Sequence, residues 1–221
     1  MRRGIDAGSA EKPAMDTVER AIDRFARAAR GHGLDVGDEQ RDLLTRSALW
    51  LASLAHASGV SAYDTVEFAV MRGMAPALAY FEASAGPRCG RLADIGAGNG
   101  AVGATIAILE QNLVVDLVDR AQRAYTACEI LAGRLALDNL QPIQADVRAL
   151  PSAEYDAAVF RALARGERAL ALVRPIVRPS GFIGAFHRHD DVAFGPGMGS
   201  IERLGSWATL VEGLVLTGYR V

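Results

Sequence analysis

The sequence predicts an α/β protein with a mostly parallel sheet, helices on both faces of that sheet, and a helical cap at its N-terminal end. Two observations carry the prediction. Residues 16–86 show helical periodicity throughout, whereas residues 87–221 alternate short apolar strands with amphipathic helices. This alternation is typical of βαβ units, whose crossover helices cover both faces of a parallel sheet. A flexible tail is expected over residues 1–15, which are small and polar.

Three helices are expected in the cap, over about residues 16–31, 38–56 and 63–84, because apolar residues recur there at spacings of three and four. Pro76 is expected to interrupt the third helix, since proline has no N–H for the i to i−4 hydrogen bond. Arginines at helical spacing on the first helix are interpreted as a solvated face, with an RNA footprint as the alternative. They are Arg20, Arg24, Arg27 and Arg30.

The second part of the chain is expected to hold five strands, followed by a short C-terminal region. The strands are placed at 91–95, 114–118, 141–144, 155–160 and 181–186, with helices near 101–111, 120–137 and 164–174. Beyond them we expect a loop at 194–199, a helix near 200–211 and a last strand over 214–221.

Amino-acid composition indicates the cellular compartment and bears on which partners the protein binds. Half of the 221 residues are hydrophobic and the net charge is −2, so the whole chain has no basic balance that indicates nucleic acid. No stretch approaches the roughly 18 apolar residues of a spanning helix. Cys89 and Cys128 form neither a CxxC pair nor a zinc spacing, which suits a reducing compartment. We therefore expect a soluble, cytoplasmic protein without membrane contact, and the oligomeric state stays open.

A glycine-rich loop after the first strand is the strongest functional signal. The run DIGAGNG at 94–100 ends the strand and leads into a helix from about Ala101. Glycines tolerate positive φ and carry no Cβ, so a nucleotide-like ligand can approach the backbone and the free N–H groups of the following helix. The loop residues expected at the ligand are Gly96, Ala97, Gly98 and Gly100.

Two interpretations of this loop are possible, each with a different ligand. The spacing of Gly98, Gly100 and Gly103 formally matches a dinucleotide fingerprint, which would indicate a dehydrogenase. The rival pattern, Asp-x-Gly-x-Gly-x-Gly from Asp94 to Gly100, is that of class I methyltransferases, which bind S-adenosylmethionine.

Acidic residues at the ends of three consecutive strands favour S-adenosylmethionine. Asp94 is placed to bind the amino group of the methionine moiety, Asp119 to accept both ribose hydroxyls, and Asp146 to accept the adenine amine. Their neighbours Arg120 and Val147 are expected beside the cofactor. Taken alone, Asp119 can be a helix cap and Asp146 a turn former. Together at one sheet edge, the three acids predict a Rossmann-like class I methyltransferase fold.

Four segments resemble one subgroup of that fold, the bacterial 16S ribosomal RNA guanine-N7 methyltransferases of the glucose-inhibited division protein B family. The similar segments are residues 93–103, 117–120, 137–144 and 155–164, and a helical N-terminal extension is also similar. The last segment looks like the family's Ser-Arg-Ala motif. The resemblance implies N7 methylation of guanine and places Arg161 where cofactor and substrate meet.

Departures from that family gather on the acceptor side. Phe160 replaces the motif serine, residues 71–76 (MRGMAP) replace Arg-His-x-x-Asp-Ser, and residues 186–189 replace a Lys-Gly pair. The chain after the fifth strand is also shorter than the family's terminal hairpin would require. We therefore expect N-methylation of a small nitrogen heterocycle. Ribosomal RNA guanine-N7 methylation is the alternative, and a non-catalytic cofactor-binding interaction module is a second one.

Three residues are candidates for the methyl-transfer step, which is an in-line displacement that positioning accelerates. Phe160 would face the sulfonium or pack under the cofactor. Arg161 would hold a carboxylate or carbonyl oxygen of the acceptor, or pair with an acid of the fold. His187 would act as a general base where the acceptor must lose a proton, with a polar strand end as the alternative. No metal is expected.

Overall fold

The structure, a computed structural model, describes residues 15–83, 86–164, 166–191 and 201–221. The expected loop at 194–199 lies outside these residues, and so does the expected tail apart from Met15, which begins the first helix. No helix in the described ranges is long and apolar enough to cross a membrane.

The cap is helical, as predicted, but its third helix is broken into pieces. The elements are α1 (Met15–Gly31), α2 (Asp38–Ala52), α3 (Leu54–Ala57), α4 (Val66–Phe68), the π-helical η1 (Ala69–Met74), the 3-10 helix η2 (Ala75–Ala77) and α5 (Leu78–Glu82). Pro76 lies in η2, so the interruption expected there is present as a change from π to 3-10 geometry.

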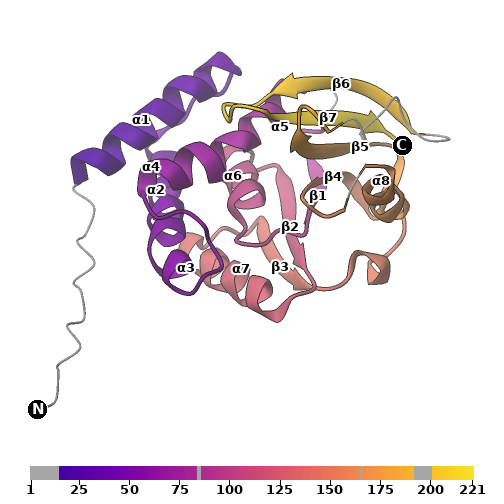
Figure 1. The fold of residues 1–221 in the computed structure, drawn as a ribbon, viewed down its shortest axis with the longest axis horizontal. Coiled ribbons are helices and arrows are strands. Elements are labelled where there is room, and N and C mark those ends of the chain that lie inside the picture. Colours follow the sequence, from indigo (N-terminus) through magenta and orange to yellow (C-terminus); the bar gives the residue numbers. More distant parts are fainter. Residues whose placement is uncertain (1–14, 84–85, 165, 192–200) are drawn as a thin grey trace, which may run out of the picture.

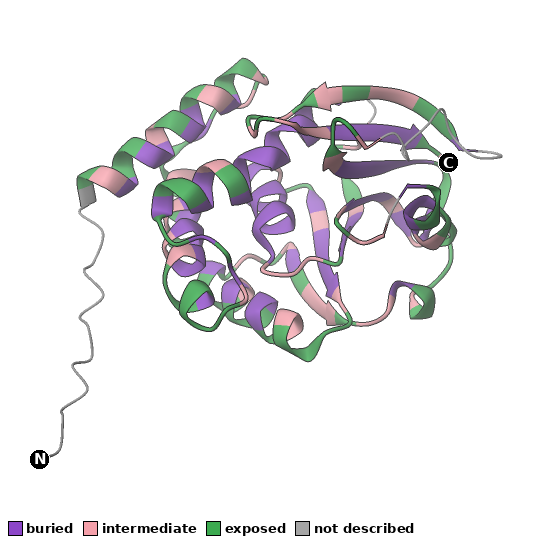
Figure 2. Ribbon diagram, in the orientation of Figure 1, coloured by how far each residue is buried: buried purple, intermediate pink, exposed green. Residues whose placement is uncertain are grey.

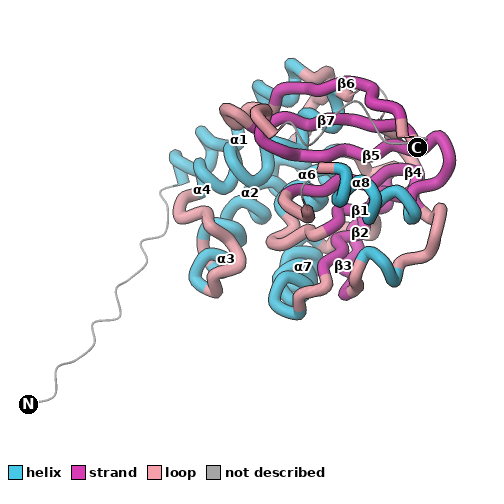
Figure 3. The backbone as a smooth tube through the Cα atoms, turned by 45° about the vertical axis from the view of Figure 1, so that its right-hand side comes forward, coloured by secondary structure: helices cyan, strands magenta, loops and turns pink. Residues whose placement is uncertain are grey.

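A seven-stranded sheet forms the centre of the molecule (Figure 3). Its strands are β1 (Gly90–Ile95), β2 (Leu113–Asp119), β3 (Leu140–Gln144), β4 (Tyr155–Arg161), β5 (Val177–Arg188), β6 (Glu202–Ala208) and β7 (Leu214–Arg220). Their order is β3-β2-β1-β4-β5-β7-β6, with β1 to β5 parallel and β7 antiparallel to both of its neighbours. The predicted fold class, a mostly parallel sheet with N-terminal helices, is confirmed.

Helices cover both faces of the sheet (Figure 1). On one side lie α6 (Ala101–Leu109), α7 (Gln122–Leu135) and the cap, and on the other lies α8 (Glu167–Val173), near the short 3-10 turns η3 (Val147–Ala149) and η4 (Arg174–Ile176). Burial of apolar surface on both faces is the main stabilising contribution to such a layered fold.

The cap and one face of the sheet share a single apolar core (Figure 2). For example, the ring of Tyr80 on α5 meets Phe182 of β5 edge to face, with centroids 5.8 Å apart. The cap therefore packs as a part of the sheet domain's own core. The predicted division of the chain into a cap ending at residue 86 and a cofactor-binding domain beginning at residue 87 stays a prediction.

The prediction of a helix near 200–211 is wrong. Residues 202–208 form β6, which pairs with β7 as an antiparallel hairpin. The expectation that the chain is too short for a terminal hairpin is wrong as well. A register shift between Arg203 and Gly205 disturbs the alternation that marks a strand, so apolar residues fall at helix-like spacing. Trp207 packs on Gly218 of β7, where a Cβ would lie 2.7 Å from the indole.

A buried carboxylate on β2 depends on one arginine. The side chain of Asp116 is fully buried, and its Oδ2 accepts hydrogen bonds from Arg91 Nε (2.9 Å) and the Tyr155 hydroxyl (2.8 Å). We expect Arg91→Met to lower the free energy of unfolding by about 3 kcal/mol, because it leaves a buried charge without its cation. Urea denaturation measures this change.

The matched control for that variant is Arg24→Met, which removes an ion pair with Glu67 whose two side chains are both more than half exposed. Exposed pairs contribute about 0–1 kcal/mol. Equal losses in the two variants would contradict the assignment of Arg91 as the partner of a buried charge.

Candidate functional site

The glycine loop connects β1 to α6 through three left-handed residues. Gly96, Gly98 and Gly100 have φ of +71°, +60° and +76°, a region that other residues rarely adopt. At Gly100 a Cβ would also lie 3.1 Å from the Leu131 side chain, so the close packing of the loop on α7 needs glycine there. The Asn99 side chain accepts a hydrogen bond from the Ala101 N–H at the start of α6 (3.2 Å).

Asp94 lies under this loop near the carboxyl end of β1. Its Oδ2 accepts a hydrogen bond from the Gly103 N–H (2.9 Å), and the residue is only 4% exposed. Burial raises the pKa of Asp94 to about 6, while the Gly103 N–H and the positive charge of Arg161 act against that rise. A Cβ on Gly103 would lie 2.8 Å from Asp94 Oδ2, so glycine at 103 is what admits the carboxylate.

Asp119 ends β2 and binds the backbone on both sides of it. One carboxylate oxygen accepts from the Gly98 N–H (3.0 Å), and the other accepts from the Ala121 N–H at the start of α7 (2.9 Å). The N-cap of α7 is Ala121, so Asp119 is not the helix cap, and its bond to the Ala121 N–H forms a turn just before the helix. Each carboxylate oxygen has a second lone pair, so these bonds still leave Asp119 able to accept from a ligand.

Asp146 follows β3 and caps η3, which matches its turn-forming interpretation. It accepts from the Arg148 N–H (3.0 Å) and forms a two-pronged ion pair with the Arg148 guanidinium, at 2.8 Å for each oxygen. These bonds to Arg148, and then Arg120 at 3.8 Å, hold the pKa of Asp146 well below its usual range. Asp146 is therefore a carboxylate at neutral pH.

Two clefts meet at Gly96, on the carboxyl edge of the sheet. The larger, of about 660 Å³, is lined by Asp119, Arg120, Asp146 and Val147 together with Leu163, Ala164, Arg168 and others. The smaller, of about 290 Å³, is lined by Asp94, Gly96, Ala97, Gly98, Asn99, Arg161 and the cap residues Val60, Ala62 and Tyr63. The three acids thus line one continuous edge with Gly96, Ala97 and Gly98, whereas Gly100 lines neither cleft.

A third cleft, of about 650 Å³, lies beyond β4 and β5. It is lined by Arg161, Ala162, Ala164, Phe186, His187, Arg188, Asp190, Asp191 and Leu214. Arg161 and Ala162 also line the smaller cleft, and Ala164 also lines the larger one. All three clefts therefore converge on residues 161–164, at the carboxyl end of β4.

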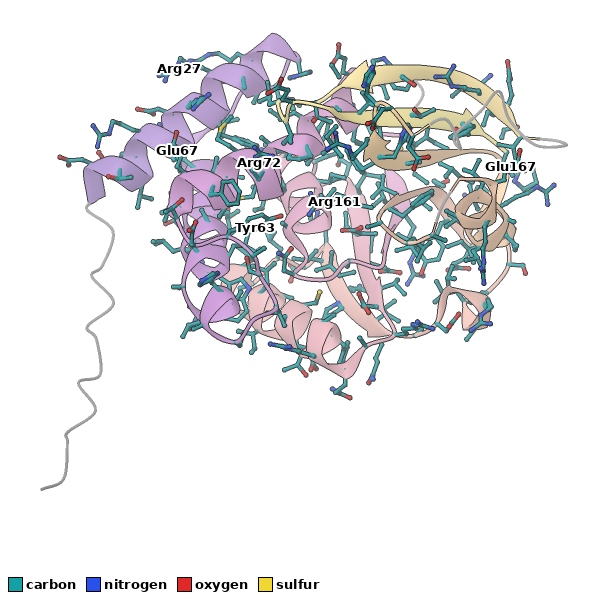
Figure 4. All side chains as sticks on the ribbon, viewed as in Figure 1. Arg27, Tyr63, Glu67, Arg72, Arg161 and Glu167 are labelled. Atoms are coloured by element: carbon teal, nitrogen blue, oxygen red, sulfur yellow. The ribbon has the colours of Figure 1, made fainter. Side chains whose placement is uncertain are left out.

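Arg161 connects this point of convergence to the cap. Its Nη2 donates to the Tyr63 hydroxyl (3.0 Å) and its Nη1 to the Arg72 carbonyl (3.3 Å). Figure 4 shows Arg161 and Tyr63 side by side at the junction between the cap and the sheet. Neither of these two bonds is the pairing with an acid of the fold that is one of the two roles expected for Arg161.

Phe160 lies elsewhere. Its side chain is 1% exposed and belongs to the apolar core on the α8 face of the sheet, with Ile95 and Ala185 beside it in the sheet register. It lines none of the three clefts. This placement favours packing over a contact with the sulfonium.

His187 faces the third cleft with both ring nitrogens engaged. Nδ1 lies 2.7 Å from the Arg188 carbonyl and must donate to it, so Nε2 of the neutral ring accepts from the Thr217 hydroxyl at 2.8 Å. Thr217 in turn lies 2.6 Å from the Ser206 hydroxyl. Burial lowers the pKa of His187, and the bond to the Arg188 carbonyl acts against that shift. The contacts favour a polar strand end over a general base.

Among the described residues, no three His, Cys, Asp or Glu side chains lie close enough to share an ion.

Sequence reasoning missed the partner of Arg161 and the partner of Asp94. The sequence places Tyr63 only at the start of the third expected cap helix, and no sequence signal connects it to Arg161, which is 98 positions away. Gly103 did carry a signal, because it completes the formal dinucleotide fingerprint. Its role here is to give Asp94 room and an N–H donor.

Comparisons with known proteins find relatives in one family. Residues 52–191 match the protein family GidB, described as rRNA small subunit methyltransferase G. The protein called ribosomal RNA small subunit methyltransferase G of Chromohalobacter salexigens is 30% identical over 149 residues, 67% of this chain and 70% of that protein. The protein of the same name in Bordetella avium is 24% identical over 169 residues, 75% of each chain.

A solved structure agrees at the level of the fold. A SAM-dependent methyltransferase from Aquifex aeolicus, 12% identical, aligns with a TM-score of 0.53 over 69% of this chain and 92% of that one. At this identity the alignment shows the fold alone.

Proposed function

The chain belongs to the GidB family, rRNA small subunit methyltransferase G, and from this premise we propose that it methylates N7 of a guanine in 16S ribosomal RNA. It is an S-adenosylmethionine-dependent methyltransferase, so the dehydrogenase and non-catalytic alternatives are set aside. The main support for ribosomal RNA as the acceptor is the extent of the match to the family. Residues 52–191 include the three acids of the cofactor edge and also the cap segment that contacts Arg161.

The residues at the ends of the first three strands fit the cofactor. We assign the 660 Å³ cleft to the adenosine part, with Asp119 accepting from the ribose hydroxyls and Asp146 near the adenine amine. The 290 Å³ cleft takes the methionine part, whose ammonium group faces the Asp94 carboxylate. When bound, S-adenosylmethionine supplies an electrophilic methyl group. These carboxylates would hold it, and the glycines would let it lie close to the loop backbone.

The 650 Å³ cleft is the proposed place of the acceptor base, because it adjoins the methionine cleft at Arg161 and Ala162. Guanine N7 has a lone pair and no proton to lose, so its methylation needs orientation and no general base. Orienting two reactants contributes up to about 7–11 kcal/mol in favourable cases. The engagement of both His187 nitrogens suits this base-free reaction.

Binding of S-adenosylmethionine is expected to weaken as the pH falls below about 6, because the cofactor ammonium needs Asp94 as a carboxylate and its pKa is about 6. One proton linked to binding predicts a rise in Kd of about tenfold per pH unit below that value. The stability of the ligand-free protein changes in the opposite sense: a raised pKa contributes stability at low pH that is lost as the pH rises through 6. Calorimetric titrations between pH 5 and 8 measure the binding, and Asp94→Asn, which cannot titrate, should flatten the profile.

The acceptor is tested with 30S subunits and naked 16S RNA from a strain that lacks the gene. With methyl-labelled S-adenosylmethionine, we expect label in 16S RNA at one guanine, which becomes a site of chain cleavage after reduction and aniline treatment, as N7-methylguanosine does. Wild-type subunits, already methylated, are the control. Label spread over several nucleotides, or none in the RNA, would contradict the proposal.

A small nitrogen heterocycle remains the second candidate, because residues 71–76 lack most of the polar groups typical of the family. The names of the relatives support the ribosomal acceptor over this one. The same labelling, repeated with the small-molecule fraction of a cell extract, distinguishes them. Transfer to that fraction together with unlabelled RNA would favour the heterocycle. A ribosomal acceptor also implies the cytoplasmic location expected from the sequence.

A further inference from the structure

The guanidinium of Arg161 is held by the cap. It donates two hydrogen bonds to cap residues, one to the Tyr63 hydroxyl at 3.0 Å and one to the Arg72 carbonyl at 3.3 Å. The same side chain lines the methionine cleft and the proposed acceptor cleft. The orientation of the cation at the reaction point is therefore set by a segment about ninety residues earlier in the chain.

Pro76 lies four residues after Arg72, whose carbonyl contacts Arg161. In a regular α-helix the N–H of residue 76 would donate to the carbonyl of residue 72, and proline has no N–H. The π-helical turn from Ala69 to Met74 ends directly before the 3-10 turn that contains this proline. The irregular helix thus presents a carbonyl to Arg161, and π-helical turns are frequent at functional sites for such reasons.

Tyr63 is fixed from several sides. It is 7% exposed, its N–H donates to the Ser61 hydroxyl (3.2 Å), and its ring meets Phe68 edge to face with centroids 5.9 Å apart. Gly73 of the π-helical turn lies against the ring, and a Cβ there would come within 2.7 Å of Tyr63 Cε2. A ring confined in this way holds its hydroxyl at one position, where the Arg161 bond uses it.

We propose that Tyr63 is a positioning residue, which keeps the Arg161 guanidinium at the boundary of the cofactor and acceptor clefts so that it can orient the acceptor. Asp94 is an alternative partner for this cation, since the two charges interact and both residues line the methionine cleft. The Tyr63 hydroxyl and the Arg72 carbonyl hold the guanidinium toward the cap. The kinetic part of this inference rests on the proposed function, whereas the contact itself does not.

The test compares Tyr63→Phe with Tyr125→Phe, which removes a tyrosine hydroxyl that bonds to Glu129 on α7, away from Arg161. A hydrogen bond to a charged group predicts a loss in kcat/KM for 30S subunits of about tenfold or more in Tyr63→Phe. We expect less than a twofold change in Tyr125→Phe. The Kd of S-adenosylmethionine and the melting temperature should change little in either variant, which separates positioning from a structural role.

A double-mutant cycle identifies Arg161 as the group on which Tyr63 acts. In an Arg161→Ala background, Tyr63→Phe should change kcat/KM by less than twofold, because the group it positions is gone. An equal loss in both backgrounds would overturn the inference, and so would wild-type activity in Tyr63→Phe.

A spectroscopic measurement separates this inference from the proposed acceptor. Nitrogen-15 NMR of arginine side chains follows the Nε–H of Arg161, assigned by its absence in Arg161→Lys. We expect slowed guanidinium rotation in the wild type and fast rotation in Tyr63→Phe, whatever the acceptor is. Inactivity toward 30S subunits with this difference present would contradict the proposed function alone. Unchanged rotation in Tyr63→Phe would contradict the positioning role.

Discussion

Replacing Asp119 by alanine is expected to raise the Kd of S-adenosylmethionine by about 100-fold or more. Two ribose hydroxyls would lose a charged acceptor, and hydrogen bonds to charged groups contribute about 1.5–3 kcal/mol each. The variant also removes acceptors from the Gly98 and Ala121 N–H groups, so the glycine loop loses one of its fixed points. Isothermal titration calorimetry measures the change.

The control for this variant is Asp138→Ala, an exposed aspartate in the turn before β3. It should leave the Kd unchanged while altering the net charge by the same amount. Circular dichroism of Asp119→Ala checks that the fold persists. A Kd within twofold of the wild type would show that the cofactor edge has been assigned to the wrong acid.

Gly103→Ala is expected to impair both stability and cofactor binding. The added methyl group would lie 2.5 Å from Leu117 Cδ2, 2.8 Å from Asp94 Oδ2 and 2.9 Å from Asp94 Cβ, so the strand or the helix must shift. Overpacking of this kind costs about 1–3 kcal/mol, and a displaced Asp94 predicts at least about tenfold weaker binding of S-adenosylmethionine. Thermal unfolding and calorimetry measure the two effects.

Gly133→Ala is the matched control, because Gly133 also lies within a helix, α7, and a Cβ there meets nothing within 4 Å. Alanine in a helix is favoured over glycine by about 0.5–1 kcal/mol, so this variant should be slightly more stable and should bind the cofactor normally. A stabilised Gly103→Ala would contradict the close contact between α6 and Asp94.

Local patterns were sufficient for most elements of the fold. The strands that became β1 to β5 and the helices around them follow from apolar periodicity, which reports burial directly. The pattern failed at β6, where a bulge near Gly205 disturbs the alternation and the partner strand β7 decides the conformation. It also failed to show that the third cap helix contains a π-helical turn, although Pro76 marked the break.

Some residues of the candidate site could likewise be predicted from the sequence, and others could not. The glycines and the three acids follow strands in sequence, so their convergence at one edge of a parallel sheet could be predicted from order alone. Phe160 could not be placed, because which face of β4 it points to depends on register, and the structure puts it in the core. For His187 the deciding partner, Thr217, comes from an antiparallel strand that pairs only in the folded protein.

By itself the sequence determined the layered α/β class, the glycine loop at 96–100 and the carboxylates of Asp94, Asp119 and Asp146, because these depend on neighbours a few residues away. The tertiary structure decided what the acids bond to, that Gly103 admits Asp94, and that Tyr63 and the Arg72 carbonyl hold Arg161. Those contacts join residues up to 98 positions apart, and only packing of the cap on the sheet brings them within hydrogen-bonding distance.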